Sequence, residues 1–102
     1  MGNSGGGKAK ITFSNELEED INIIILEAAN HDNELGKGSI NKGKSSVIGV
    51  LPKNSYHVIV TSKSTDEEII KDNVMAVGDK VPKVVIGPNK HTKRIEISKV
   101  KE

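Results

Sequence analysis

Apolar and polar residues alternate along much of this chain with a period of two. The alternation is clearest in residues 9–14 and 56–61, where apolar side chains occupy every second position. Successive side chains of a β-strand point to opposite faces of a sheet, so this pattern predicts strands with one buried face. Residues 16–20 are the one helical candidate, and they are too short to stand alone. The chain is therefore expected to be all-β.

Residues 21–28 form the most hydrophobic of the predicted strands. Ile23, Ile24 and Ile25 put isoleucine on both faces, which favours a central strand that is covered on both sides. Residues 72–77 are the weakest stretch, either a short strand or an irregular crossing. Further strands are predicted at residues 39–40, 45–51, 68–71, 81–86 and 94–100, with Pro82 at a strand start or on a sheet edge.

The segments between these strands are rich in turn residues. Asn41 and Gly43 suit a tight hairpin, because glycine adopts positive φ readily. Residues 31–37 are polar and contain a glycine, so they are expected to form a loop. Strands at spacings of roughly ten residues predict a single antiparallel β-sandwich of about seven strands. Its expected core is Ile11, Phe13, Ile23, Ile25, Ile48, Val50, Val58, Val60, Val85, Ile95 and Ile97.

The length and composition define one small domain. The chain has 102 residues, the size of a single folding unit. Residues 1–7 are rich in glycine and are expected to be a flexible tail, with the β-sandwich domain at residues 8–102. Isoleucine and valine dominate the apolar residues, and such β-branched side chains suit a pleated surface. The chain has no Cys, which excludes disulfides and thiolate ligands.

Charge and aromatic content argue against nucleic acid as a partner. The formal net charge is +1, Arg94 is the only arginine, and Phe13 and Tyr56 are the only aromatic residues. Arginine forks and stacking rings, with which proteins read bases, are therefore nearly absent. The N-terminus lacks the apolar segment of a secretory signal, and no apolar run reaches the length of a membrane span. A cytoplasmic location is expected.

Residues Gly38–Ser45 match the phosphate-loop pattern G-x-x-x-x-G-K-[ST]. That loop requires a buried strand before it and a helix after it, so that N–H groups converge on the phosphates. The residues before Gly38 are polar, and Gly49 and Pro52 follow where the helix should grow. The context favours a β-turn rich in Gly and Lys, with nucleotide binding kept as a remote alternative.

Metal binding is not expected from the remaining polar residues. His31, His57 and His91 are far apart and lack the paired spacing of zinc sites, so exposed histidines are the preferred interpretation. Acidic residues cluster at residues 16–20 and 32–34, and again at 66–68. These clusters lack the D-x-[DN]-x-[DN]-G spacing of a calcium loop, and they are interpreted as solvated turns. The sequence therefore predicts no metal ligand and no cofactor.

The catalytic inventory is small. The chain contains no G-x-S-x-G elbow and no Ser/His/Asp set that the sequence itself joins. None of its carboxylates has the apolar neighbours that would raise a pKa for general acid catalysis. The sequence therefore predicts a protein that is not an enzyme and has no catalytic residue.

The first residues suggest one membrane-related alternative. Met1 and Gly2 are followed by small residues, as at an N-myristoylation site, and Lys8 and Lys10 would add attraction to acidic lipid. The pattern requires Ser or Thr at the sixth position, where this chain has Gly6. A single acyl chain also binds membranes only marginally. A peripheral membrane protein acylated at Gly2 is therefore the second interpretation.

Five short segments together resemble a known group of small β-sandwiches. They are Lys10–Asn15, Ile21–Ile25, Gly38–Ile40, Gly43–Val47 and Tyr56–Val58. This order resembles aegerolysin-like and PUD-type domains over about the first sixty residues, with actinoporins and thaumatin-like proteins as more distant parallels. The resemblance implies an aegerolysin-like sandwich that binds lipid headgroups, membranes or a protein. An immunoglobulin-like sandwich is the other architecture expected for this fold class. The resemblance transfers no binding residue, since lipid-binding members use aromatic-rich loops and both aromatic residues here lie in predicted strands.

These observations favour a non-catalytic β-sandwich that acts as a binding or interaction module. The expected partner is an unidentified protein or lipid, without nucleic acid and without a transmembrane segment. Homo-oligomers through an edge strand are a further option, because unpaired N–H and C=O groups accept another strand.

Overall fold

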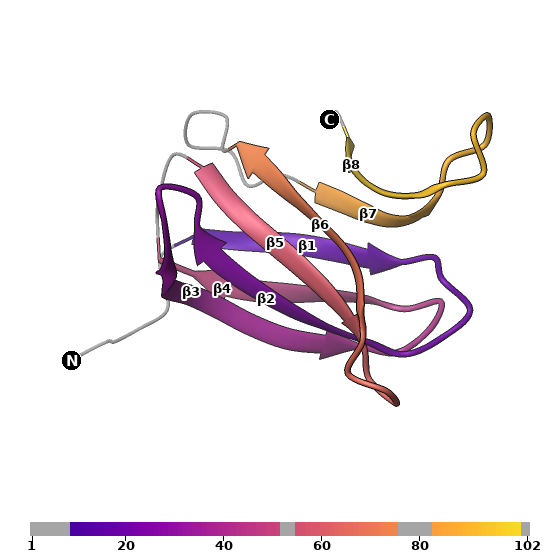
Figure 1. Cartoon of the computed structure of the whole chain (residues 1–102), viewed down its shortest axis with the longest axis horizontal. Coiled ribbons are helices and arrows are strands. Elements are labelled where there is room, and N and C mark those ends of the chain that lie inside the picture. Colours follow the sequence, from indigo (N-terminus) through magenta and orange to yellow (C-terminus); the bar gives the residue numbers. More distant parts are fainter. Residues whose placement is uncertain (1–8, 52–54, 76–82, 101–102) are drawn as a thin grey trace.

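The computed structural model describes residues 9–51, 55–75 and 83–100, and these ranges form a β-sandwich of two four-stranded sheets (Figure 1). The all-β sandwich expected from the sequence is confirmed. Its eight strands are β1 (Ala9–Asn15), β2 (Ile21–Glu27), β3 (Asn30–Ile40), β4 (Ser45–Val50), β5 (Ser55–Ser62), β6 (Glu68–Met75), β7 (Lys83–Pro88) and β8 (Ile95–Val100). The predicted tail at residues 1–7 lies outside the described residues, as does Pro82.

The two sheets differ in strand direction. Sheet B has the order β3-β2-β5-β6 and is antiparallel throughout. Sheet A has the order β4-β1-β7-β8, and its β1 and β7 run parallel, with Asn15 opposite Ile86. The expectation of a wholly antiparallel sandwich is therefore wrong at this one pair. No local turn connects β1 to β7, so no turn signal in the sequence determines their relative direction.

The core lies between the sheets and is filled mainly by aliphatic side chains. The inward residues of β2 are isoleucines with no exposed surface, and full burial of such a side chain stabilises the fold by about 1.5–3 kcal/mol. Both aromatic residues are also inside. The buried apolar residues are Ile11, Phe13, Leu17, Ile21, Ile23, Ile25, Leu35, Ile40, Ile48, Val50, Tyr56, Val58, Val60, Val74, Val84 and Ile86.

Three of the predicted core residues are not fully buried, although Ile97 packs against the core. Val85 is only half-buried, because the pairing with β1 turns Val84 and Ile86 inward instead. Ile97 is half-buried and Ile95 is 40% exposed, since β8 is the outer strand of sheet A. The run Val84–Ile86 has no alternation, so its inward face could not be read from the sequence.

Strand β2 is central in sheet B, as predicted, but the described residues leave its outer face partly exposed. Its neighbours are β3 and β5. Ile21, Ile23 and Ile25 face the core, whereas Ile24 and Leu26 on the other face are only half-buried. The isoleucine on both faces thus reflects one buried face and one partly exposed apolar face.

The polar segment 31–37 is part of strand β3 and not a loop. It pairs with β2, and the register shifts where Ile25 faces Gly36 while Leu26 faces Glu34. This bulge turns Leu35 into the core and interrupts the alternation that identifies a strand. As an outer strand, β3 also needs few apolar residues, so hydrophobicity gave no signal.

The turn between β3 and β4 connects the two sheets and does not form the predicted hairpin. The backbone carbonyl oxygen of Asn41 accepts a hydrogen bond from the N–H of Lys44 at 3.1 Å, and Gly43 has a φ of 73°. The tight turn and its positive φ are therefore confirmed. However, β3 pairs with β2 and β4 pairs with β1. The two strands are the outer strands of their sheets and their backbones approach closely, since a Cβ on Gly36 would lie 2.5 Å from the carbonyl oxygen of Gly49.

Asn15 joins several chain segments at one end of the sandwich, and only 1% of it is exposed. Its Nδ2 donates to the carbonyl oxygens of Glu19 at 2.8 Å and Ile40 at 3.1 Å, and its Oδ1 accepts from the N–H of Leu17 at 2.9 Å. Its backbone bonds to Gly43 and Lys44. One amide side chain therefore connects the end of β1, the β1–β2 connection and the end of β3.

No helix in the described ranges combines the length and the apolar character needed to cross a bilayer.

We predict that Asn15→Ala lowers the free energy of unfolding by about 3 kcal/mol, because it removes three hydrogen bonds, two of which, to the carbonyl oxygen of Ile40 and the N–H of Leu17, are buried. Asn15→Asp should cost at least as much near pH 7, since a carboxylate would face the carbonyl oxygens of Glu19 and Ile40. Urea unfolding measures both changes. The exposed Asn41→Ala is the control and should change stability by less than about 0.5 kcal/mol. Equal effects at positions 15 and 41 would contradict the role given to Asn15.

Close packing of β3 on β4 gives a second prediction. Gly36→Ala should lower stability by about 1–3 kcal/mol, because the new methyl group meets a backbone oxygen that moves only with its strand. Gly38→Ala should cost less, since its methyl group meets the flexible end of Ile48 at 3.0 Å. Thermal and urea unfolding of the two variants provide the comparison. A larger loss of stability for Gly38→Ala would show that β3 and β4 are not tightly packed at Gly36.

Candidate functional site

The segment Gly38–Ser45 forms a strand end, a turn and the start of β4. The N–H of Lys42 donates to Oδ1 of Asp20 at 2.8 Å, and the N–H of Gly43 donates to the carbonyl oxygen of Asn15 at 2.9 Å. The hydroxyl of Ser45 lies 2.8 Å from that of Ser14. Two N–H groups and the hydroxyl that a phosphate loop would direct at its ligand are thus engaged within the protein.

This geometry supports the turn interpretation of the segment. A strand follows the turn where a phosphate loop has a helix, so no helix N-terminus adds to the local field. The carboxylate of Asp20 also lies at the N–H group that would face an anion. Letter matching alone therefore misrepresents the local chemistry of this turn.

The acidic clusters lie on the surface. The carboxylates of residues 16–20 and 66–68 are exposed, as are Asp32 and Glu34 on β3. Glu19 accepts a hydrogen bond from the hydroxyl of Ser62 at 2.6 Å. Within the ranges 9–51, 55–75 and 83–100, no group of three or more His, Asp or Glu side chains is arranged to hold a metal ion.

The structure brings two of the three histidines together. The rings of His31 on β3 and His57 on β5 are stacked, with centroids 4.1 Å apart and an interplanar angle of 14°. Nδ1 of His57 lies 2.7 Å from Oδ1 of Asn73 on β6. His91 lies in the turn between β7 and β8, and its N–H is bonded to Asn89. The expectation that all three are separate is therefore wrong for this pair, which β2 separates in the sheet.

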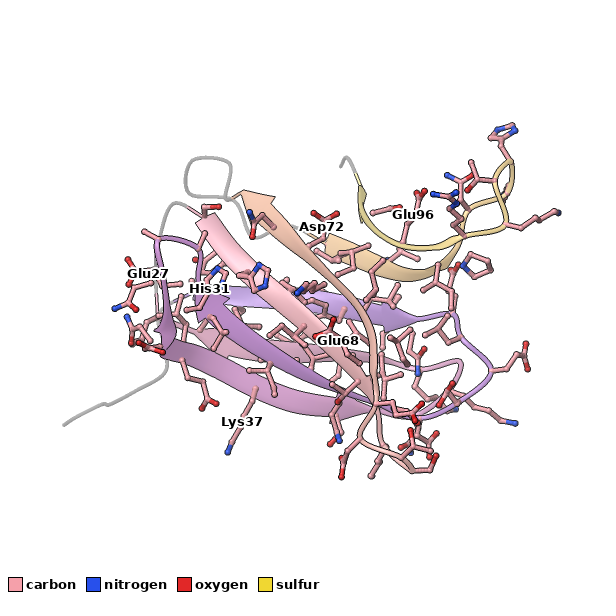
Figure 2. All side chains as sticks on the ribbon, viewed as in Figure 1. Glu27, His31, Lys37, Glu68, Asp72 and Glu96 are labelled. Atoms are coloured by element: carbon pink, nitrogen blue, oxygen red, sulfur yellow. The ribbon has the colours of Figure 1, made fainter. Side chains whose placement is uncertain are left out.

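A row of four residues crosses the outer face of sheet B. Lys37 of β3 is paired with Ile24, Ile24 with Ile59, and Ile59 with Lys71 of β6. Directly paired residues point to the same face of a sheet, so the two isoleucines lie between the two lysines. Both isoleucines are half-buried and both lysines are exposed, and Lys37 projects away from the sandwich (Figure 2). We call these residues the Lys-Ile row.

A shallow hollow of about 630 Å³ adjoins this row. Ile24 and Lys37 line it together with polar side chains of β2, β3 and β5, and with Asp66 from the β5–β6 turn. A second hollow of about 400 Å³ lies near the β3–β4 turn and is lined by Glu19, Asp20, Lys42, Lys63 and Ser64. Several of its groups are bonded within the protein, including Asp20 and Glu19. The first hollow is therefore the better candidate for a binding surface.

The buried polar side chains of the described residues all have hydrogen-bond partners. Asn15 and Ser62 are its buried polar residues, and both are hydrogen-bonded. No buried side-chain nitrogen or oxygen in the described ranges lacks a partner. Such an interior leaves no polar group directed at an internal ligand, so the functional chemistry of this part of the chain has to be sought on its surface.

Sequence reasoning missed the Lys-Ile row and the histidine pair. The row depends on the register of four strands. One signal could have revealed part of it, because Ile24 and Ile59 are apolar at positions where the alternation of β2 and β5 places the outward face. The pair His31 and His57 depends on which strands flank β2. Neither arrangement follows from spacing along the chain.

Comparison with protein-family models and with curated proteins gives no match for the chain. The structure shows an all-β domain of two sheets, and membership of the aegerolysin-like or PUD-type group has no support from a family model.

We predict that Mg-ATP, Mg-GTP and Ca²⁺ leave the melting temperature unchanged. A ligand that binds the native state raises it by mass action, whereas the N–H groups of the 42–44 turn are already bonded. A thermal-shift titration of the full chain gives the answer. A nucleotide-dependent rise that disappears in Lys44→Ala would restore the phosphate-loop interpretation.

Proposed function

We propose that the chain is a non-catalytic interaction module that binds a partner protein through the outer face of sheet B. The observation that carries this proposal is the Lys-Ile row. Partly exposed isoleucines at the centre of a sheet provide apolar area for contact, and the flanking lysines provide attraction at its margins. Such an arrangement suits a partner that presents an apolar strip between acidic side chains.

The opposite face of the sandwich differs in the centre of its sheet. There, the outward residues of the central strands β1 and β7 are mostly polar: Lys10, Thr12 and Ser14 in β1 and Lys83 in β7. The one outward aliphatic side chain among them, the half-buried Val85, is paired with Ser14, which is bonded to Ser45. Val47 of the outer strand β4 is 57% exposed, but its partner in β1 is the polar Thr12. The apolar centre flanked by lysines is therefore a feature of sheet B, and this contrast supports one binding face.

The non-catalytic part of the proposal rests on the exposed acidic clusters and the filled interior. General acid–base catalysis uses carboxylates in settings that shift their protonation, usually within a concave pocket. The carboxylates of residues 16–20 and 66–68 are exposed, and the two hollows described above are open to the surface. These features suit recognition by a surface better than chemistry in a pocket.

A protein partner is favoured over a lipid surface by the position of the aromatic side chains. Phe13 is 0% exposed and Tyr56 is 2% exposed, so neither is available at a membrane interface, where aromatic anchors are common. Lipid binding remains the second candidate, since the lysines of the Lys-Ile row would attract acidic headgroups and the sequence resembles aegerolysin-like and PUD-type domains. Gly2, the acylation candidate, lies outside the described residues.

Location and assembly are further parts of the proposal. A cytoplasmic location is consistent with the absence of Cys from the chain. A net charge of +1 with one arginine is the reason to propose no nucleic-acid partner. Homo-oligomers through an outer strand are compatible with two open sheets, and the mass of the purified chain in solution tests them.

The test uses a photo-crosslinking amino acid at position 59 of the full chain, in the cell from which the protein comes. We predict crosslinks to a discrete protein from position 59 and none from the matched position 47 on the opposite face. With that protein purified, Lys37→Glu/Lys71→Glu should weaken direct binding at least tenfold, because both marginal charges are reversed. Lys10→Glu/Lys83→Glu makes the same change in net charge on sheet A and should leave affinity within twofold.

Equal weakening by the two double variants would show that net charge, and not this face, determines binding. Sedimentation with vesicles of phosphatidylserine and phosphatidylcholine tests the second candidate, which is binding to a lipid surface. Strong binding to these vesicles that disappears in Lys37→Glu/Lys71→Glu would replace the protein partner by a lipid surface.

A further inference from the structure

We propose that His31 and His57 form a binding site for a divalent transition-metal ion on the outer face of sheet B. The ion belongs to the class that accepts imidazole nitrogen, such as Cu²⁺, Zn²⁺ or Ni²⁺. This inference goes beyond the proposed function and does not depend on a protein partner.

The first support is the proximity of two imidazoles from separate strands. Their ring centroids are 4.1 Å apart, although β3 and β5 lie on opposite sides of β2. His57 is opposite Leu26 in the register, and the ring of His31 reaches across to it. The fold thus places two imidazoles, which are the commonest metal ligands, side by side on this face.

The second support is the hydrogen bond between His57 and Asn73. With Oδ1 of Asn73 as the acceptor, Nδ1 of His57 is the donor, and in the neutral ring with this tautomer Nε2 carries the lone pair. Metal-ligating histidines commonly donate their other N–H to a carbonyl or carboxylate, which fixes the ring and its tautomer. Asn73 is therefore a positioning residue for His57.

Metal binding requires one change in the pair. The lone pairs of an imidazole lie in its ring plane, so two nearly parallel rings do not direct both lone pairs at one point. His31 is exposed, whereas His57 is half-buried and bonded to Asn73. The ring of His31 can therefore tilt out of the stack while His57 stays in place.

The remaining coordination positions belong to water. Among the described residues no third His, Asp or Glu completes a group with this pair, so the affinity should be lower than that of a structural zinc site. Cu²⁺ is the strongest probe, because it leads the divalent series for nitrogen and oxygen ligands and accepts water in a tetragonal arrangement.

The experiment titrates the full chain with Cu²⁺, with calorimetry for affinity and electron paramagnetic resonance for the number of nitrogen ligands. We expect one ion per chain on this site, with two imidazole nitrogens. His31→Ala and His57→Ala should each weaken binding at least tenfold. His91→Ala is the matched control and should leave the affinity within twofold, because His91 is in the β7–β8 turn, outside the pair.

Asn73 provides an independent readout. Asn73→Leu should weaken Cu²⁺ binding about 10- to 100-fold. Asn73→Asp should keep the affinity of the natural chain, because a carboxylate also accepts the Nδ1 hydrogen. Circular dichroism confirms that each variant is folded. The proposal is overturned if either His31→Ala or His57→Ala binds Cu²⁺ as the natural chain does, if only one nitrogen is found, or if His91→Ala causes an equal loss.

Discussion

The side-chain amide of Asn15 joins the two sheets at one end of the sandwich. It donates from β1 of sheet A to the end of β3 in sheet B, and it also holds the β1–β2 connection. A buried amide is costly without partners, and here each of its donors and its oxygen has one. The turn that returns the chain from sheet B to sheet A is bonded to the same residue through Gly43 and Lys44.

Once the sheets are joined in this way, the aliphatic side chains determine which faces remain available. The inward isoleucines of β2 and the valines of β5 fill the core, so Ile24 and Ile59 must face outward. Glycine at position 36 lets β3 approach β4, and the N–H of Leu51 reaches the carbonyl oxygen of Leu35. The outer face of sheet B then carries both the Lys-Ile row and the histidine pair.

The sequence predicted those features that arise from local patterns. Alternation identified β1 and β5, and the Asn–Gly signal identified the turn at residues 41–44. It found only the last two residues of β3, because the bulge at Leu35 breaks the alternation, and it misjudged the inward face of β7, because Val84–Ile86 has no period. The Lys-Ile row and the histidine pair were beyond prediction, since strand order and register create both. Asn15 gave no distinct signal, because asparagine at a strand end is equally typical of a simple turn.

Amide hydrogen exchange measured by NMR tests the role of Asn15 most directly. Leu17 lies in a connection, yet its N–H donates to the buried Oδ1 of Asn15, so it should exchange nearly as slowly as the amides of the central strand β2. In Asn15→Ala that protection should disappear while β2 stays protected. Exchange of Leu17 at the rate of a free peptide in the natural chain would contradict the account.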